Sequence, residues 1–140
     1  DAGGGYSRSA FNEYGDIEWE DNGCIYDFSE YQSSVPKISD NVVERLNNLS
    51  EYLESKGATL LLAAYPIADT PNRSSDEEFI NFENELKEKM IAPVVSHYTD
   101  YIYPCDYFFD TNLHLNNVGK HARTNQLIED LTNYLTETDK

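Results

Sequence analysis

Residues 58–65 (ATLLLAAY) decide the fold that we predict for this chain. Apolar residues follow one another there, whereas a strand with one face in water would alternate apolar and polar side chains. A short unbroken apolar run is typical of a parallel strand that is covered on both faces. Pro66 has no backbone N–H, so we predict that the strand ends there and that residues 67–74 form a loop.

A helix is predicted before this strand. It is expected to begin at Ser39 or Asp40 and to end at Lys56–Gly57, because glycine commonly follows the last turn of a helix. Its apolar residues recur at spacings of three and four, which predicts one buried stripe. The stripe consists of Val42, Leu46, Leu49 and Leu53.

Two further helices are predicted after the strand, with a short second strand at residues 92–95 between them. Ser75 and Glu78 match a capping box, which marks the start of the second helix. Its inner face is expected to be Phe79, Phe82, Leu86 and Met90. The last helix is predicted from Asn116 or Asn117 to about Leu135. Its apolar face consists of Val118, Ala122, Leu127, Ile128, Leu131 and Leu135.

The order of these elements predicts the fold class. Strands that alternate with helices of this length form a parallel sheet with right-handed crossovers. We therefore predict an α/β domain over residues 36–140, with helices on both faces of the sheet. The whole chain of 140 residues is long enough to bury one core.

The first 35 residues differ from the rest, with eight acidic residues and one basic residue. Residues 16–28 alternate apolar and polar side chains on either side of Asp21-Asn22-Gly23, a sequence that favours a tight hairpin turn. We expect residues 1–35 to form an acidic N-terminal arm, either a hairpin or an irregular segment, that packs on the core through its aromatic side chains.

The charge of the chain limits its partners. With 26 acidic and 10 basic residues, the net charge is -16 at pH 7. Such a field repels phosphate backbones and anionic membrane surfaces, so neither nucleic acid nor lipid headgroups are expected partners, whereas a sugar or an aminoacyl group is compatible. No apolar run approaches the ~20 residues of a membrane span, so membrane insertion is not expected. Cys24 and Cys105 can form one disulfide or remain two unrelated thiols. The oligomeric state is left open.

Candidate chemistry lies in the loops that follow the two strands, because functional groups gather beyond the carboxyl ends of parallel strands. The second of these loops, residues 98–115, contains a run of tyrosines, then Asp110 and His114.

This loop and the helix after it resemble the last conserved block of the SGNH hydrolase superfamily of serine esterases and acyltransferases. The matching residues are Phe108-Phe109-Asp110, His114-Leu115-Asn116, Gly119 and Arg123-Thr124. The style is closest to the extracytoplasmic acyl-transfer branch, which includes the teichoic-acid D-alanylation and alginate acetylation proteins. The resemblance implies a flavodoxin-like fold and an extracytoplasmic or secreted location. No metal or other cofactor is expected, because neither the cysteines nor the histidines have the spacing of metal ligands.

In that family, the resemblance implies that His114 is the general base for a serine and that Asp110 orients the imidazole. The family leaves two residues between this Asp and His, whereas this chain has three, so Asn112 is an alternative orienting group. The family's Gly-Asp-Ser nucleophile block is absent, since residues 15–17 read Gly-Asp-Ile. We therefore expect the chain to correspond to the C-terminal half of an SGNH fold. Within this sequence, Ser7 and Ser9 are the alternative candidates for the nucleophile.

Two functional hypotheses follow. The first is ester hydrolysis or O-acyl transfer on a cell-surface carbohydrate or a related acyl ester. A chain without its nucleophilic serine would not have this activity. The alternative is a non-catalytic module that binds carbohydrate or a protein partner. In either, Asn112, Tyr101 and Tyr107 are candidate substrate-binding residues, the two tyrosines because their rings can stack on sugars. The structural alternative is that Asp110 and His114 only cap the helix and that the tyrosines form a core layer.

Overall fold

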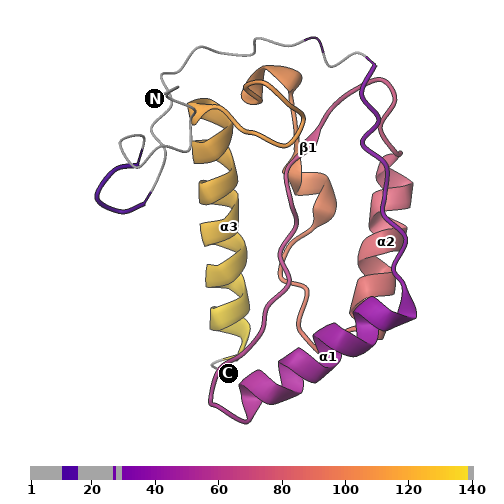
Figure 1. Ribbon diagram of the computed structural model, residues 1–140, viewed down its shortest axis with the longest axis vertical. Helices are drawn as coiled ribbons and strands as arrows, with labels where there is room; N and C mark the ends of the chain where they lie inside the picture. The colour runs from indigo at the N-terminus through magenta and orange to yellow at the C-terminus, as the bar shows by residue number, and fades with distance from the viewer. Residues whose placement is uncertain (1–10, 16–26, 28–29, 139–140) are drawn as a thin grey trace, which may run out of the picture.

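The computed structural model describes residues 11–15, 27 and 30–138 (Figure 1). In this part of the chain, two short parallel strands, β1 (Ile67–Ala68) and β2 (Ile102–Tyr103), lie among three α-helices. The helices are α1 (Asp40–Glu54), α2 (Asp76–Lys89) and α3 (Asn117–Thr138). The 3₁₀ turns η2 (Tyr98–Tyr101) and η3 (Cys105–Tyr107) flank β2. The predicted hairpin and most of the predicted acidic arm lie outside the described residues, as does Cys24.

The two strand segments pair in parallel, as predicted, but at two separate places. Leu62 forms an isolated bridge with Val94, and β1 pairs with β2 further along. Between these pairings the first segment advances by five residues (62 to 67) and the second by eight (94 to 102). The turn η2 takes up the difference and interrupts the ladder.

The prediction of continuous strands over residues 58–65 and 92–95 was therefore wrong in extent, and a strand lies in the predicted loop after Pro66. Proline removes one backbone donor but does not prevent an extended backbone at the next residue. Ile67 and Ala68 are both buried in the core, and their burial carries the strand past the proline.

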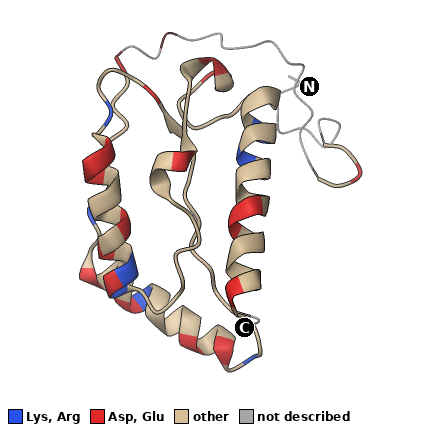
Figure 2. Ribbon diagram, turned by 180° about the vertical axis from the view of Figure 1, so that it is seen from behind, with Lys and Arg blue, Asp and Glu red and all other residues tan. Residues whose placement is uncertain are grey.

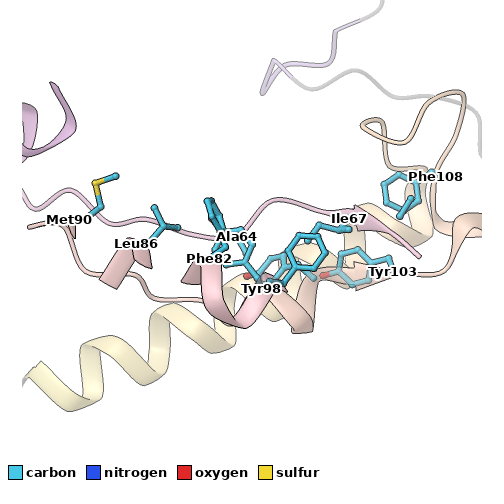
Figure 3. Packing of buried hydrophobic residues seen from close by; sticks show 11 residues of the cluster. Ala64, Ile67, Phe82, Leu86, Met90, Tyr98, Tyr103 and Phe108 are labelled. Carbon is cyan, nitrogen blue, oxygen red and sulfur yellow. The ribbon is translucent and has the colours of Figure 1, made fainter. Parts of the chain in front are cut away.

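Helix α2 matches its prediction closely. The Ser75 backbone N–H donates to Glu78 Oε2 at 2.8 Å, and the Glu78 N–H donates to Ser75 Oγ at 3.3 Å, which completes the capping box. All four predicted inward residues are in the core. Figure 3 shows Phe82, Leu86 and Met90 in a row beside Ala64 and Ile67. Four apolar side chains at helical spacing thus fix α2 against the strands.

Helix α1 begins after its predicted cap, Ser39, but presents a different face to the core. Val42 and Leu49, predicted to be buried, are exposed, whereas Val43 and Leu46 pack against the core. The Asn47 side chain explains the rotation. Its Nδ2 donates to the Lys89 carbonyl at 3.0 Å and its Oδ1 accepts from the Ile91 N–H at 2.9 Å, so it pins α1 to the end of α2.

Helix α3 also departs from its predicted apolar face. Ala122 packs against the core, but Val118, Ile128 and Leu135 are exposed, and the buried residues are Gly119 and Asp130. The Tyr101 hydroxyl donates to Asp130 Oδ2 at 2.7 Å, and this bond turns a polar face of α3 inward. None of the described helices has the length and apolar character needed to cross a membrane.

Buried tyrosines contact α2 and α3. The Tyr98 ring packs edge-on against Phe82 of α2, with 5.1 Å between ring centroids, and Tyr101 bonds to Asp130 of α3. Burial raises the pKa of Tyr98 to about 12, and burial together with the Asp130 carboxylate raises the pKa of Tyr101 to about 12. The hydroxyls are therefore protonated in the folded state at pH values where exposed phenols ionise.

This difference predicts alkaline sensitivity. The unfolded chain ionises its tyrosines near pH 10, whereas folding keeps Tyr98 and Tyr101 protonated to about pH 12. The stability that depends on these phenols is complete below pH 10 and is lost as the pH rises toward 12, by roughly 1–2 kcal/mol per group. Urea unfolding at pH 9 and pH 11 measures this loss. Tyr101→Phe should reduce the loss of unfolding free energy between pH 9 and pH 11, and the exposed Tyr52→Phe should not. An equal loss in both variants would contradict the assignment to Tyr101.

Candidate functional site

The candidate site is a short hairpin-like loop between η3 and α3. Phe108 and Leu115 form an antiparallel bridge, and the Phe109 N–H donates to the His114 carbonyl at 2.8 Å. Phe108 is fully buried, so the loop is anchored in the core at the point where it leaves η3. The residues between Phe109 and Leu115 project from this anchor.

Thr111 shapes the tip of the loop. Its Oγ1 accepts from the backbone N–H groups of Leu113 and His114, each at 3.2 Å. These bonds fold the three residues between Asp110 and His114 into a turn that brings the two side chains to the same side.

Asp110 and His114 form a close pair. His114 Nδ1 lies 2.8 Å from Asp110 Oδ1, and the two side chains are 57% and 43% exposed, respectively. With Nδ1 bonded to the carboxylate, the other ring nitrogen of His114 has no hydrogen-bond partner among the described residues. Asn112, the alternative orienting residue, instead lines a hollow beside Tyr65 and Phe79.

Two residues behind the loop hold it against α3. Asn116 is buried; its Nδ2 donates to the Asp106 carbonyl at 2.6 Å and its Oδ1 accepts from the Gly119 N–H at 3.0 Å. Its backbone N–H also donates to the Tyr107 carbonyl at 2.9 Å. Gly119 lies so close to Tyr107 that a side-chain methyl group would overlap the Tyr107 carbonyl oxygen. These contacts make η3, the loop and the first turn of α3 one packed unit.

The two candidate tyrosines differ in their surroundings. Tyr101 has 0% exposure and donates to Asp130, so it is a core residue and not the substrate-binding residue that the sequence led us to expect. Burial of its large aromatic ring favours the core over the surface. Tyr107 is half-buried and stacks on Tyr103, with 6.0 Å between ring centroids. The sequence indicated tyrosines in this segment but not which of them face inward.

Two hollows adjoin the loop, and Leu113 lines both. One, of about 190 Å³, is bordered by Tyr65, Ile67, Phe79 and Asn112. The other, of about 420 Å³, is bordered by Leu115 and by side chains from the first two turns of α3. The loop that carries the Asp110–His114 pair thus borders one largely apolar hollow and one hollow of mixed polar and apolar lining, although neither side chain of the pair lines them.

A second carboxylate–imidazole pair, formed by Glu83 and His97, was not predicted from the sequence. It lies at the start of η2, where His97 is the N-cap residue. Glu83 is buried and accepts from His97 Nδ1 at 2.9 Å, from Lys87 Nζ at 2.6 Å and from the Tyr98 N–H at 3.0 Å. Burial raises the pKa of Glu83, but these three hydrogen bonds outweigh burial and leave the pKa below its ordinary value. The signal in the sequence was a glutamate on the core-facing side of α2. Its contact with Tyr98 anchors η2, a structural role.

Comparisons of the chain with models of protein families, with curated proteins and with solved structures find no match.

Proposed function

We propose that this protein is an SGNH-like ester hydrolase or O-acyltransferase that acts outside the cytoplasm on an acyl ester of a cell-surface carbohydrate. The observation that carries the proposal is the 2.8 Å contact between Asp110 Oδ1 and His114 Nδ1 on an exposed loop. The parallel strands and the helix that follows the loop are compatible with the C-terminal half of a flavodoxin-like SGNH fold. The proposal also includes the larger parallel sheet of the SGNH fold, of which β1 and β2 would be two strands.

The pair has the arrangement that base catalysis needs. When Nδ1–H donates to Asp110, the tautomer is fixed with its lone pair on Nε2. His114 then takes the proton of an attacking hydroxyl as the hydroxyl oxygen bonds to the acyl carbon. The same proton passes to the leaving alcohol oxygen when the ester bond breaks, and Asp110 stabilises the imidazolium in between.

The smaller hollow supports an acyl ester as substrate. Its volume of about 190 Å³ and its apolar borders, Ile67, Phe79 and Leu113, suit a short acyl chain. Ser33, Ser34 and Asn112 add polar groups at its rim. A short acyl group held there would lie beside the loop that carries His114.

The proposal places the nucleophilic serine outside the described residues, because within them no hydroxyl group is hydrogen-bonded to the imidazole ring of His114. Labelling of the full-length gene product with a fluorophosphonate probe, followed by peptide mapping, identifies this serine. Ser7 and Ser9 are candidates within the present sequence.

The catalytic role of His114 is tested with the same probe and a chromogenic acetate ester. We expect His114→Ala to abolish labelling and to lower the hydrolysis rate by about 10²–10⁴-fold, the usual contribution of a general base. His97→Ala is the matched control, because His97 also pairs with a carboxylate but lies away from the loop, and it should retain the labelling. Absence of labelling in the full-length gene product would refute the enzymatic proposal.

The binding-module alternative makes a different prediction. Binding of a carbohydrate or protein partner would survive His114→Ala and would weaken when Tyr107 is truncated. The complete burial of Tyr101 leaves this alternative with one of its two aromatic contacts. The acid–base pair therefore favours the enzymatic proposal.

A further inference from the structure

Among the described residues, those that line the larger hollow beside the site include two basic ones and no acidic one. Its volume is about 420 Å³, and Lys120 and Arg123 reach it from the first two turns of α3. Leu113 and Leu115, the neighbours of His114 in sequence, form part of its wall. A ligand in this hollow would therefore contact the loop that carries the candidate base, although His114 itself does not border the hollow.

The charge of this hollow contrasts with the rest of the chain. Residues 117–128 contain two basic residues and no acidic one, in a chain whose net charge is -16. Figure 2 shows basic residues near the start of α3 and acidic residues only further along it. These two basic residues therefore locally oppose the acidic field of the rest of the molecule.

Lys120 and Arg123 share one hollow and have no counter-charge among the described residues, a lack that Lys37, Arg45 and Lys56 share elsewhere on the protein. Arg73 bonds to Asp69 and Asp76, and the α2 residues Lys87 and Lys89 each bond to a glutamate four positions earlier. Within residues 11–15, 27 and 30–138, neither Lys120 nor Arg123 has an ion pair or a hydrogen bond from its side chain. Two unpaired cations in one hollow of an acidic protein are left available to an external anion.

We propose that Lys120 and Arg123 form a binding site for an oxyanion, a carboxylate or phosphate group on the ligand of this protein. The planar guanidinium suits bidentate contact with either group, and the lysine ammonium adds a second charge. The Thr124 hydroxyl supplies a further donor at the border of the hollow, and the positive end of the α3 dipole lies nearby. As a statement about substrate, this inference rests on the proposed function and adds that the ester substrate carries a negative charge.

A structural role for Arg123 is the competing explanation. The Tyr103 hydroxyl is buried without a hydrogen-bond partner among the described residues, and Arg123 is close enough for its charge to oppose the burial that raises the pKa of Tyr103. If Arg123 served only this hydroxyl, Tyr103→Phe would abolish its role. An oxyanion site predicts instead that Tyr103→Phe retains anion binding.

The test is an NMR titration of the protein with inorganic phosphate and, separately, with acetate, each against sodium chloride at equal ionic strength. We expect saturable shifts of the Leu113–Thr124 amides with a dissociation constant on the order of a few millimolar. The stronger of the two probes identifies the oxyanion. Arg123→Gln should weaken binding at least tenfold and the exposed Lys120→Gln about threefold to tenfold. Arg45→Gln, an exposed cation on α1, should leave binding unchanged.

Each result separates this inference from the proposed function. Shifts no larger than those in sodium chloride, or an equal loss in Arg45→Gln, would overturn the oxyanion site and leave serine labelling unaffected. Anion binding that persists in His114→Ala supports the site even if labelling fails. Because Lys120 is exposed, Lys120→Gln tests the site without the risk of unfolding that Arg123→Gln carries.

Discussion

Gly119→Ala is expected to lower the free energy of unfolding by about 1–3 kcal/mol, although alanine is the better helix former by about 1 kcal/mol. The added methyl group would overlap the backbone carbonyl oxygen of Tyr107 and would also press on the Leu115 side chain. Backbone cannot rotate away as a flexible side chain can, so η3 and α3 must separate. That separation breaks the contacts by which Asn116 holds the site loop.

The matched control for this prediction is Asn125→Ala. Asn125 is exposed on the same helix, so alanine there should leave stability unchanged or raise it by a few tenths of a kcal/mol. Chemical denaturation measures both variants, and the His114 ring signals in NMR report the loop. A Gly119→Ala variant as stable as Asn125→Ala would show that α3 does not pack on Tyr107 as described.

Glu83→Ala is expected to lower the free energy of unfolding by about 2 kcal/mol at pH 7. The substitution leaves the buried Tyr98 N–H without its acceptor. It also removes the carboxylate to which the Lys87 and His97 side chains are hydrogen-bonded. Glu85→Ala is the control, because Glu85 forms the same kind of pair with Lys89 on a more exposed face. Exposed pairs of this kind contribute less than about 1 kcal/mol, so the control should lose little.

The same glutamate predicts acid sensitivity. Its pKa is lower in the folded protein than the ordinary glutamate value near 4.3 of the unfolded chain. The contribution of Glu83 to stability is therefore present above about pH 4.3 and is lost as the pH falls through its lower folded value. We expect the stability gap between wild type and Glu83→Ala to narrow between pH 5 and pH 3. A gap that stays constant over this range would mean that Glu83 is not a bonded carboxylate.

The helix positions could be predicted from the sequence, but not all of their faces. Local chemistry decides where a helix starts, and the Ser39 and Ser75 caps are read directly from residue type. The face of α2 was also predictable, because large apolar side chains leave it one choice. The rotations of α1 and α3 depend on single polar contacts to distant residues, Asn47 with Lys89 and Asp130 with Tyr101. A helical repeat carries no information about such partners.

The site was predictable to the level of residue pairs within one loop. Asp110 and His114 were singled out together, and the structure places them in contact. The turn made by Thr111 could not be anticipated, because hydroxyl-to-backbone bonds depend on the exact local backbone. The burial of Tyr101 could not be anticipated either, since tyrosine suits both a core and a surface. Glu83 and His97 were missed because they are distant in sequence.

The contacts that shape the acid–base pair have a common property, their short separation along the chain. They join Asp110 to His114, Phe108 to Leu115, Asp106 to Asn116 and Tyr107 to Gly119. Closing loops of this size costs little entropy and takes about 10–100 ns for ten residues. Residues 106–119 therefore make most of the contacts that shape the pair among themselves, while Phe108 anchors them in the core. Grafted onto another protein with a compatible helix and core contact behind it, this segment should still bring Asp110 and His114 together. The rest of the chain then determines which ligand reaches the pair.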